Sequence, residues 1–277
     1  SQGFSAVQAK SGPMKLLVSV AEVPAVAENF EIEDGTVPER YLDYDLNEWD
    51  EYALEEAVSL REAGVADEVV TVTIGPERAE DSIRMAMAKG ADRAIRIWDE
   101  SLAGGTLEDV AVRAELLASV VEDEDPILTL TGVQAADDGY GATGVALART
   151  LDVQWAAVVN DLALDPEAGT ARVRRELEGG LEEVSTIDLP AVLTVQSGIN
   201  KPRYASLRGL QEARQQEIAV RTPADLGIDD DRLRARVERG ALVEPEPRGD
   251  TEYVEGEPEE QATAIAGLLE DAEVIEE

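Results

Sequence analysis

The sequence predicts an α/β fold, doubly wound around a mainly parallel β-sheet. Short apolar runs rich in Val, Ile and Leu alternate with segments in which apolar residues recur every three or four positions. The first pattern is typical of strands buried on both faces, and the second of amphipathic helices. Because single helices separate successive strands, the strands are expected to run parallel, with helices on both faces. This architecture is Rossmann-like.

The expected elements alternate from residue 14 onward. The strands are expected at residues 16–23, 69–75, 93–98 and 127–132, and the helices at residues 50–63, 77–89, 106–121 and 145–151. The second helix is stopped by Gly90, as is common at helix ends.

An antiparallel hairpin is expected at one edge of the sheet. Glu178-Gly179-Gly180 combines an acidic residue with two glycines, which favour a reversing turn. The candidate strands are VRREL before the turn and EEVSTI after it, and the apolar run LPAVLTV then returns the chain to the sheet.

The charge of the chain defines the environment in which it folds. Of 277 residues, 60 are Asp or Glu and 24 are Lys or Arg, so the formal net charge at pH 7 is −36. Such an excess makes nucleic acid an unsuitable partner, and the compact state repels itself unless salt screens it. Acidic residues on every expected helix, with four Lys in all, are typical of an extremely halophilic archaeon. Disorder is excluded, because 44% of the residues are hydrophobic and their periodicity is clear.

Missing residue types exclude several classes of chemistry. The sequence contains no Cys and no His, so it has no disulfide, no thiolate metal site and no Ser-His-Asp or Cys-His catalysis. The pair Asp137-Asp138 is expected to cap its loop, not to bind a metal. No run approaches the ~20 apolar residues of a membrane helix and no signal peptide is visible, so we expect a cytoplasmic protein without membrane insertion.

Three segments are expected along the chain. Residues 1–13 lack a periodic pattern and precede Met14, so they are interpreted as a leader or a cloning remnant. Residues 14–220 form the α/β domain. Residues 221–277 are acidic and rich in Pro, with a helix expected at Glu259–Asp271. This last segment has little core of its own, and it is either a frayed tail or an arm that packs on a partner.

The loop after the strand ILTLTG is the candidate anion site. Ligands of open α/β sheets bind beyond the carboxyl ends of the strands, where the winding reverses. GYGATG, residues 139–144, matches G-x-G-x-x-G, but it begins too far past the strand for a dinucleotide fingerprint. Residues 134–144 fit a phosphate cradle better, with small residues, the Thr143 hydroxyl and a helix N-terminus as donors. The alternative is a Gly-rich loop without a ligand.

Several motifs in this order resemble one protein family. They are KLLVSVAEVP, DLNEWDEYALEEAVSLRE, LTGVQAADDGYGATG, RELEGGLEE before LPAVLTV, and INKPRYASL. From residue 15 to the C-terminus, the chain resembles the β subunit of electron transfer flavoproteins, the FixA family. The resemblance implies a heterodimer with an α subunit that holds the redox FAD, and a C-terminal arm that wraps onto that subunit. It also implies a Rossmann-like fold of the type that binds adenine nucleotides, with a nucleotide in this chain that is either AMP or, in electron-bifurcating members, a second FAD.

The resemblance further implies a set of nucleotide contacts near the carboxyl ends of the strands. By position these are Ser19, Ala21, Asn47, Ile74, Gln134, Ala135, Asp137, Gly139, Gly141, Thr143 and Gly144. The chain departs from the family at two nearby positions, where Val133 replaces the usual Lys and Ala142 replaces a frequent Gln.

A second candidate site follows the strand LPAVLTV. The resemblance implies that Leu207 anchors partner dehydrogenases on a loop that runs to Gln211, because a single apolar anchor in a partner's pocket is a typical hot spot. The whole docking segment is Arg203, Tyr204, Ala205, Ser206 and Leu207. Two alternatives stay open: the loop caps the sheet, or Arg203 faces the flavin-bearing subunit. The three Trp residues, at 49, 98 and 155, are expected to fill the core or an interface.

The combined expectation is an electron carrier subunit without bond-making catalysis of its own. The resemblance implies that it takes electrons from flavin dehydrogenases, such as acyl-CoA dehydrogenases, and passes them towards a quinone oxidoreductase. A free-standing nucleotide-binding module, similar to universal stress proteins, is the alternative. A nucleotide-dependent ligase or hydrolase is disfavoured, because the sequence has neither a P-loop nor His.

The net charge generates the first testable prediction. Folding should require molar salt, because screening shortens to about 3 Å only near 1 M ionic strength. Circular dichroism against KCl concentration measures this requirement. Full helical signal in dilute buffer would show that charge repulsion does not limit folding.

Overall fold

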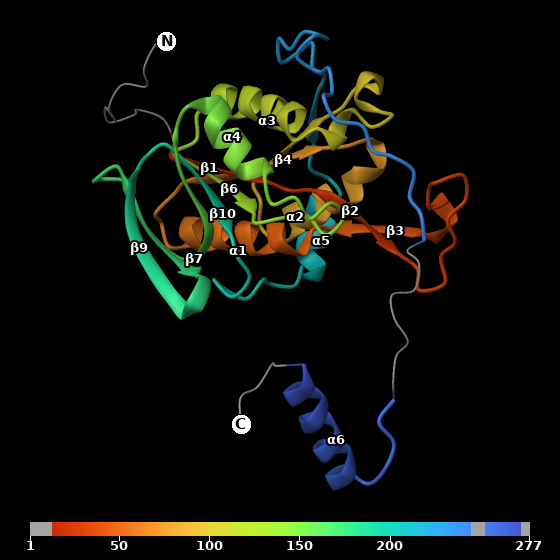
Figure 1. The fold of residues 1–277 in the computed structure, drawn as a ribbon. Coiled ribbons are helices and arrows are strands. Elements are labelled where there is room, and N and C mark those ends of the chain that lie inside the picture. Colours follow the sequence, from red (N-terminus) through yellow and green to blue (C-terminus); the bar gives the residue numbers. More distant parts are fainter. Residues whose placement is uncertain (1–12, 245–252, 273–277) are drawn as a thin grey trace. The chain divides into compact units, whose positions relative to one another are not determined.

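The computed structural model describes residues 13–244 and 253–272 (Figure 1). Residues 1–12, most of the expected leader, lie outside the described residues. The chain divides into two compact units, Ser1–Ala241 and Leu242–Glu277. The first unit contains the sheet and its covering helices. The second contains α6 (Pro258–Asp271).

The first unit is built on a nine-stranded sheet, and the expected fold class is confirmed. In spatial order the strands are β11 (Ile218–Arg221), β5 (Arg93–Ile97), β4 (Glu68–Ile74), β1 (Lys15–Ser19), β6 (Leu128–Gly132), β10 (Ala191–Val195), β7 (Gln154–Asp165), β8 (Thr170–Leu177) and β9 (Leu181–Asp188). Pairing is parallel from β11 to β7. β8 and β9 then add the expected antiparallel hairpin at the edge.

Helices cover both faces of the sheet, as Figure 1 shows. One face carries α1 (Glu48–Glu62), α2 (Glu80–Ala88) and α5 (Leu207–Ala213), and the other α3 (Val110–Glu124) and α4 (Thr143–Leu151). Short 3-10 helices lie at Glu39–Tyr41, Glu77–Ala79, Glu100–Leu102, Thr106–Glu108 and Glu178–Gly180. The four helices expected in the parallel part of the chain are therefore confirmed, with ends that differ by a few residues.

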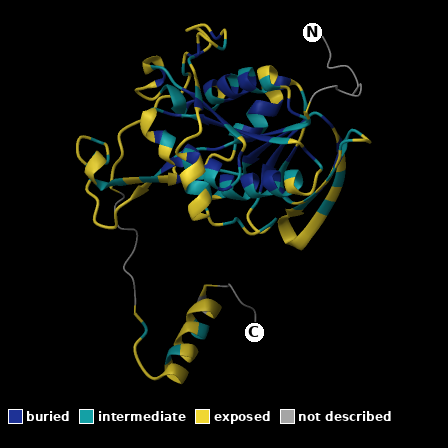
Figure 2. Cartoon of the chain, turned by 180° about the vertical axis from the view of Figure 1, so that it is seen from behind, coloured by how far each residue is buried: buried dark blue, intermediate teal, exposed yellow. Residues whose placement is uncertain are grey.

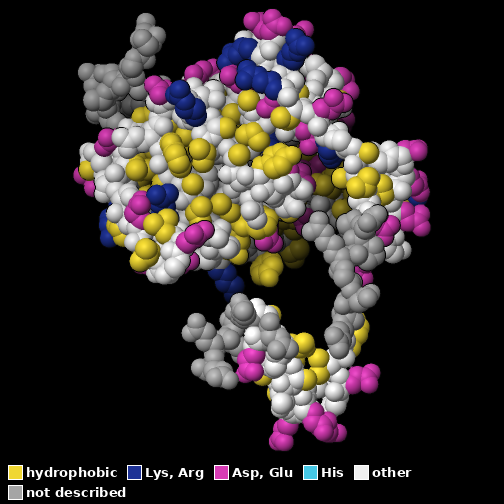
Figure 3. All heavy atoms as spheres, in the orientation of Figure 1, with side chains coloured by type: hydrophobic (Ala, Val, Ile, Leu, Met, Phe, Trp, Pro, Cys, Tyr) yellow, Lys and Arg dark blue, Asp and Glu magenta, His cyan; other side chains and the backbone are white. Residues whose placement is uncertain are grey.

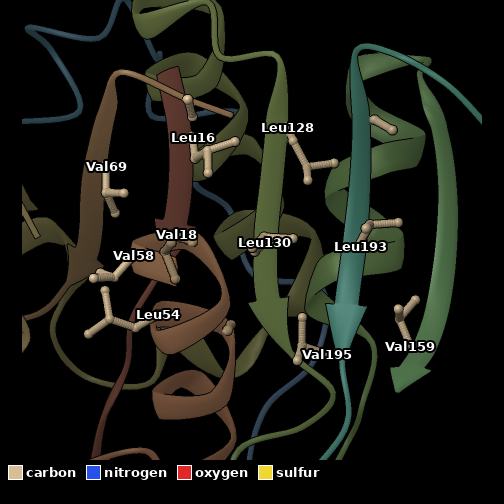
Figure 4. Close-up of a cluster of buried hydrophobic side chains, with 14 of the residues drawn as sticks. Leu16, Val18, Leu54, Val58, Val69, Leu128, Leu130, Val159, Leu193 and Val195 are labelled. Carbon is tan, nitrogen blue, oxygen red and sulfur yellow. The ribbon is translucent and has the colours of Figure 1, made fainter. Parts of the chain in front are cut away.

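The core is divided by the sheet into two main layers. Alternate residues of β1 enter opposite layers: Leu16 and Val18 pack with Leu54 of α1, whereas Leu17 packs with Leu116 of α3. Figure 4 shows Leu16, Val18 and Leu54 in the first layer. This alternation is the period of two that a strand imposes, and it explains why β1 is apolar at successive positions. Each such side chain contributes about 1.5–3 kcal/mol through burial.

The expected first strand, residues 16–23, is wrong at its end. β1 stops at Ser19, and residues from Glu22 to Val26 form a separate strand, β2. β2 pairs antiparallel with β3 (Leu42–Leu46) in a two-stranded sheet. Past Ser19 the N–H of Val20 still donates to Val72 O of β4 at 2.9 Å, whereas the N–H of Ala21 donates to Asp50 Oδ2 at 2.8 Å and not to a strand.

The sequence analysis did not identify three strands, namely β3, β7 and β11. β7 has a mixed burial pattern, because it pairs with the buried strand β10 and with the exposed hairpin. Its backbone is also irregular: Val158 has a positive φ of 62°, and the pairing register shifts nearby. A simple alternation of apolar and polar residues is therefore absent from its sequence.

The α/β unit continues beyond Val220, where the composition changes. Ile228 and Leu233 are buried in the layer that contains α3 and α4. In the second unit, α6 confirms the expected helix at Glu259–Asp271. It begins with Pro258 and a capping box between Glu257 and Glu260.

Surface exposure differs between the elements. Figure 2 shows exposed residues along the β8–β9 hairpin and α6, in contrast to the central strands. Acidic side chains are distributed over the face seen in Figure 3. Of the three Trp residues, Trp98 packs against the core and Trp49 is half-buried, but Trp155 is exposed. Core filling is therefore excluded for Trp155.

Candidate functional site

The carboxyl ends of β1 and β6 mark the point where the winding of the sheet reverses. From β1 the chain adds β4 and β5 on one side, then returns to place β6 and β10 on the other. In open α/β sheets this switch point is where ligands bind, because the loops diverge there. Ser19 ends β1, Ile74 ends β4 and the loop from Val133 to Ala142 follows β6.

A buried carboxylate joins these two strand ends. Asp50, in the first turn of α1, is 6% exposed. Its Oδ2 accepts from Ala21 N at 2.8 Å, and its Oδ1 accepts from Gly132 N at 2.8 Å. A Cβ at Gly132 would lie 2.6 Å from Asp50 Oδ1, so the approach requires glycine there. Sequence reasoning missed this residue, because an acidic residue in a first helical turn is ordinary.

Asn47 fixes the loop that follows β6. It is the N-cap residue of α1 and is 1% exposed. Its Nδ2 donates to Gln134 O at 2.9 Å, its Oδ1 accepts from Ala136 N at 3.3 Å, and its own backbone N–H donates to Ala21 O. The structure thus brings Ala21, Asn47 and Gln134 together. Asn47 supports the loop through both ends of its carboxamide.

The loop also holds its own shape. Asp137 Oδ1 accepts from Asp138 N at 2.9 Å, and Asp138 Oδ1 accepts from Tyr140 N at 2.9 Å. The other oxygen of Asp138 pairs with Arg113 Nη1 of α3 at 2.7 Å. The acidic pair therefore caps the loop, as expected. Among the described residues, no group of three or more acidic side chains is arranged to hold a metal ion.

The helix after the loop starts at Thr143, two residues earlier than expected, so Thr143 and Gly144 lie in its first turn. The N-cap residue Ala142 has no side-chain oxygen, so it cannot cap the first-turn N–H groups. A Cβ at Gly144 would lie 2.6 Å from both Thr131 Oγ1 and Thr194 Cγ2. Gly144 thus lets α4 pack closely on β6 and β10, with its positive end at the loop.

The remaining predicted contacts lie at the same edge. Gly139 and Gly141 have φ of 62° and 60°, a left-handed conformation that glycine adopts without strain. The N–H of Gly139 donates to Ala135 O at 3.0 Å. Together with the strand-end residues Ser19 and Ile74, these residues complete the predicted set at the carboxyl edge.

The docking segment, residues 203–207, lies apart from this edge. The side chain of Arg203 contacts Glu55 of α1. Ser206 is the N-cap of α5, and its side-chain oxygen accepts from Gly209 N at 2.9 Å. Leu207 is therefore the first residue of a helix, not part of a loop that continues to Gln211. Tyr204 is 94% exposed and Leu207 is 82% exposed, so both apolar side chains project from the surface.

A cavity of about 270 Å³ lies at the opposite, amino ends of β6 and β10. Its lining includes Val121, Thr129, Leu151, Pro190 and Val192, and none of the predicted site residues. The cavity is thus distinct from the site at the switch point. Across residues 13–244 and 253–272, no helix has the length and hydropathy needed to cross a bilayer.

Replacing Asp50 with Asn should change how stability depends on pH. Burial raises the pKa of Asp50 from 3.8 to about 6, against the lowering effect of the N–H groups and of Asn47. The folded state therefore binds this proton more tightly, and the carboxyl lowers the free energy of unfolding as pH rises from 3.8 to about 6. In the variant the free energy of unfolding lacks this pH-dependent decline. The difference in free energy of unfolding between the variant and wild type should therefore change by about 3 kcal/mol between pH 3.8 and about 6, and should be constant above that.

Urea unfolding at fixed KCl concentration measures both proteins. Asp123→Asn, at an exposed position on α3, is the matched control. A difference between wild type and Asp50→Asn that is independent of pH would contradict a proton-binding carboxyl at this position.

The chain is similar to known proteins of one family. A family model described as an electron transfer flavoprotein domain matches residues 34–226. The chain is 43% identical over 264 residues to the electron transfer flavoprotein subunit beta of Methylophilus methylotrophus, covering 92% of this chain and 98% of that protein. It is 38% identical over 237 residues to the mitochondrial subunit beta of Oryza sativa subsp. indica, with 85% and 91% covered. It is also 38% identical over 186 residues to subunit beta of Homo sapiens, with 67% and 71% covered. The chain therefore belongs to the beta subunit family of electron transfer flavoproteins.

Proposed function

We propose that this subunit holds AMP at the switch point of its sheet and carries electrons as part of a complex with an alpha subunit. The observation that supports this site most directly is the loop between β6 and α4. Asn47 and Asp50 hold this loop at the carboxyl ends of the strands, and it ends at a helix N-terminus without a side-chain cap. Backbone N–H groups in such a place are a general anion-binding arrangement.

The residues present fit the phosphate of a nucleotide. The chain is strongly acidic, so fixed backbone dipoles suit an anion here better than free Lys or Arg side chains. A Cβ at Gly141 would lie 3.3 Å from Val133 O, so the loop is compact as well as left-handed there. Thr143 and Gly144 offer first-turn N–H groups, and the Thr143 hydroxyl adds one further donor.

The other residues of the proposed site surround the rest of the nucleotide. They are Ser19, Ala21, Asn47, Ile74, Gln134, Ala135, Asp137 and Gly139. We favour AMP over a second FAD, because nothing in this loop demands a second flavin. The redox chemistry belongs to the FAD shared with the alpha subunit, which accepts and passes on electrons. This chain would then form no bonds in the reaction and would act by binding and by docking.

The proposed donors are flavin dehydrogenases, such as acyl-CoA dehydrogenases, and the proposed acceptor is a quinone oxidoreductase. The exposed side chains of Tyr204 and Leu207 suit a protein contact, because a projecting apolar residue among polar neighbours is a typical anchor. The C-terminal segment that contains α6 is proposed to pack on the alpha subunit. An extremely halophilic source and a cytoplasmic location are proposed from the composition.

Thr143→Val should weaken nucleotide retention while leaving the fold intact. The variant loses one hydroxyl donor to a charged group, worth about 1.5–3 kcal/mol, and Val nearly matches Thr in shape. Gly141→Asp should weaken retention further, because it adds a carboxylate and a Cβ where the phosphate approaches. Mass spectrometry of nucleotide released from the denatured complex measures retention and distinguishes AMP from FAD.

Thr150→Val, at an exposed position near the other end of α4, is the matched control and should retain wild-type nucleotide. Wild-type nucleotide content in both Thr143→Val and Gly141→Asp would move the site away from this loop.

Leu207→Ala should slow electron transfer from the dehydrogenase without changing flavin content or the stability of the complex. Loss of an interface anchor is expected to weaken the encounter complex by about 2 kcal/mol or more. The rate of flavin reduction against complex concentration measures this effect. Val220→Ala, at an exposed apolar position on the edge strand β11, serves as control. Reduced flavin occupancy or unfolding in Leu207→Ala would instead identify a structural residue.

A further inference from the structure

The docking segment is held on α1 by an ionic fork. Arg203 Nε and Nη2 donate to the two carboxylate oxygens of Glu55 at 2.8 Å and 3.0 Å. Its Nη1 and Nη2 donate to the two oxygens of Glu62 at 2.7 Å and 3.0 Å. The backbone N–H of Arg203 also donates to Glu55 Oε2 at 3.0 Å. One guanidinium thus bridges two carboxylates, and this geometry is specific to Arg.

A second contact holds the same residue from α2. Lys89, at the C-terminal end of α2, donates its Nζ to Arg203 O at 3.1 Å and pairs with Glu51 Oε1 at 2.6 Å. Both the N–H and the C=O of Arg203 are therefore bound to side chains of the helical layer. Glu51, Glu55 and Glu62 are spaced by four and seven residues, so they share one face of α1.

The first turn of α5 is also held in place, by close packing on α2. A Cβ at Gly209 would lie 2.5 Å from Ala88 O, so only glycine at this position allows α5 to pack this closely on the end of α2. The backbone that carries Tyr204 and Leu207 is therefore fixed at both ends, by the contacts of Arg203 and by the packing of Gly209. The two exposed side chains project from a backbone with little freedom to move.

The burial of the two acidic partners differs. The side chain of Glu55 is 12% exposed, and that of Glu62 is 52% exposed. Burial alone would raise the pKa of Glu55, but the guanidinium and N–H of Arg203 outweigh it and hold this pKa below its usual range. The Glu55 pair is thus the less solvent-screened half of the fork, whereas the exposed Glu62 pair is weaker.

We propose that Glu55, acting through Arg203, is a positioning residue for docking: it holds the segment from Arg203 to Leu207 in the conformation that a partner flavoprotein recognises. The proposal rests on the proposed function of Leu207. Pre-ordering a binding segment removes the entropy loss that a partner would otherwise have to overcome. Arg203 then serves docking from within the subunit, because its guanidinium is committed to α1.

The test uses Glu55→Gln in the complex of both subunits. Glu122→Gln is the matched control, because it removes the same charge from an exposed position on α3, on the other face of the sheet. The first readout is hydrogen exchange of the peptide that contains the Arg203 amide. We expect exchange there to become faster by roughly tenfold or more in Glu55→Gln, and to stay unchanged in Glu122→Gln.

The second readout is kinetic, with an acyl-CoA dehydrogenase that reduces the wild-type complex as the donor. Glu55→Gln should raise the KM for the complex roughly tenfold and keep kcat within about twofold, with nucleotide content unchanged. Glu62→Gln should change KM in the same direction by less. In Leu207→Ala, by contrast, KM should rise while Arg203 exchange stays as in wild type.

The outcomes separate this proposal from the proposed function. If hydrogen exchange of the Arg203 peptide is unchanged in Glu55→Gln, the ion pairs of Arg203 do not restrain the segment and the proposal is wrong. Faster exchange with an unchanged KM would overturn the role of these ion pairs in docking, provided that Leu207→Ala still raises KM. If Leu207→Ala also leaves KM unchanged, the docking function itself fails at this segment, and the positioning role fails with it.

Discussion

The rest of the site depends on one buried carboxylate at the top of the sheet. Asp50 accepts from the N–H of Ala21, two residues past β1, and from the N–H of Gly132, the last residue of β6, so it links the ends of two strands. Burial of a charge is costly, and here two backbone donors and Asn47 offset part of that cost. The loop after β6 starts from this contact, because Gly132 N donates to Asp50 Oδ1.

Helix α1 serves two separate surfaces with different chemistry. Its N-terminus presents Asn47 and Asp50 to the loop of the proposed nucleotide site. Glu55 lies about two helical turns past Asn47, roughly 12 Å along the axis, and binds Arg203 of the docking segment. Both sets of residues lie in one short sequence, DLNEWDEYALEEAVSLRE.

The sequence predicts whatever depends on local pattern, and misses what depends on distant partners. The buried parallel strands and their helices are confirmed because apolar periodicity alone specifies them. The contact between Ala21 and Asp50, just past the end of β1, is missed because the two residues are 29 positions apart in the chain. Likewise, Arg203 appears free in its motif, and only the tertiary fold brings Glu55 and Glu62, more than 140 residues away in sequence, against it. The resemblance predicts which residues form the site, and the structure shows the hydrogen-bond partners of these residues.

Two Arg residues of this acidic chain hold the two proposed functional segments in place. Arg113 pairs with Asp138 in the proposed nucleotide loop, and Arg203 pairs with Glu55 and Glu62 at the proposed docking segment. In the molar salt that we predict from the net charge, the Debye length is only about 3 Å, so long-range attraction between this subunit and the proposed partners would be largely lost. Pairs in direct contact and partly buried are screened much less. We therefore propose that recognition under these conditions relies on apolar contact, for which the exposed side chains of Tyr204 and Leu207 are suited.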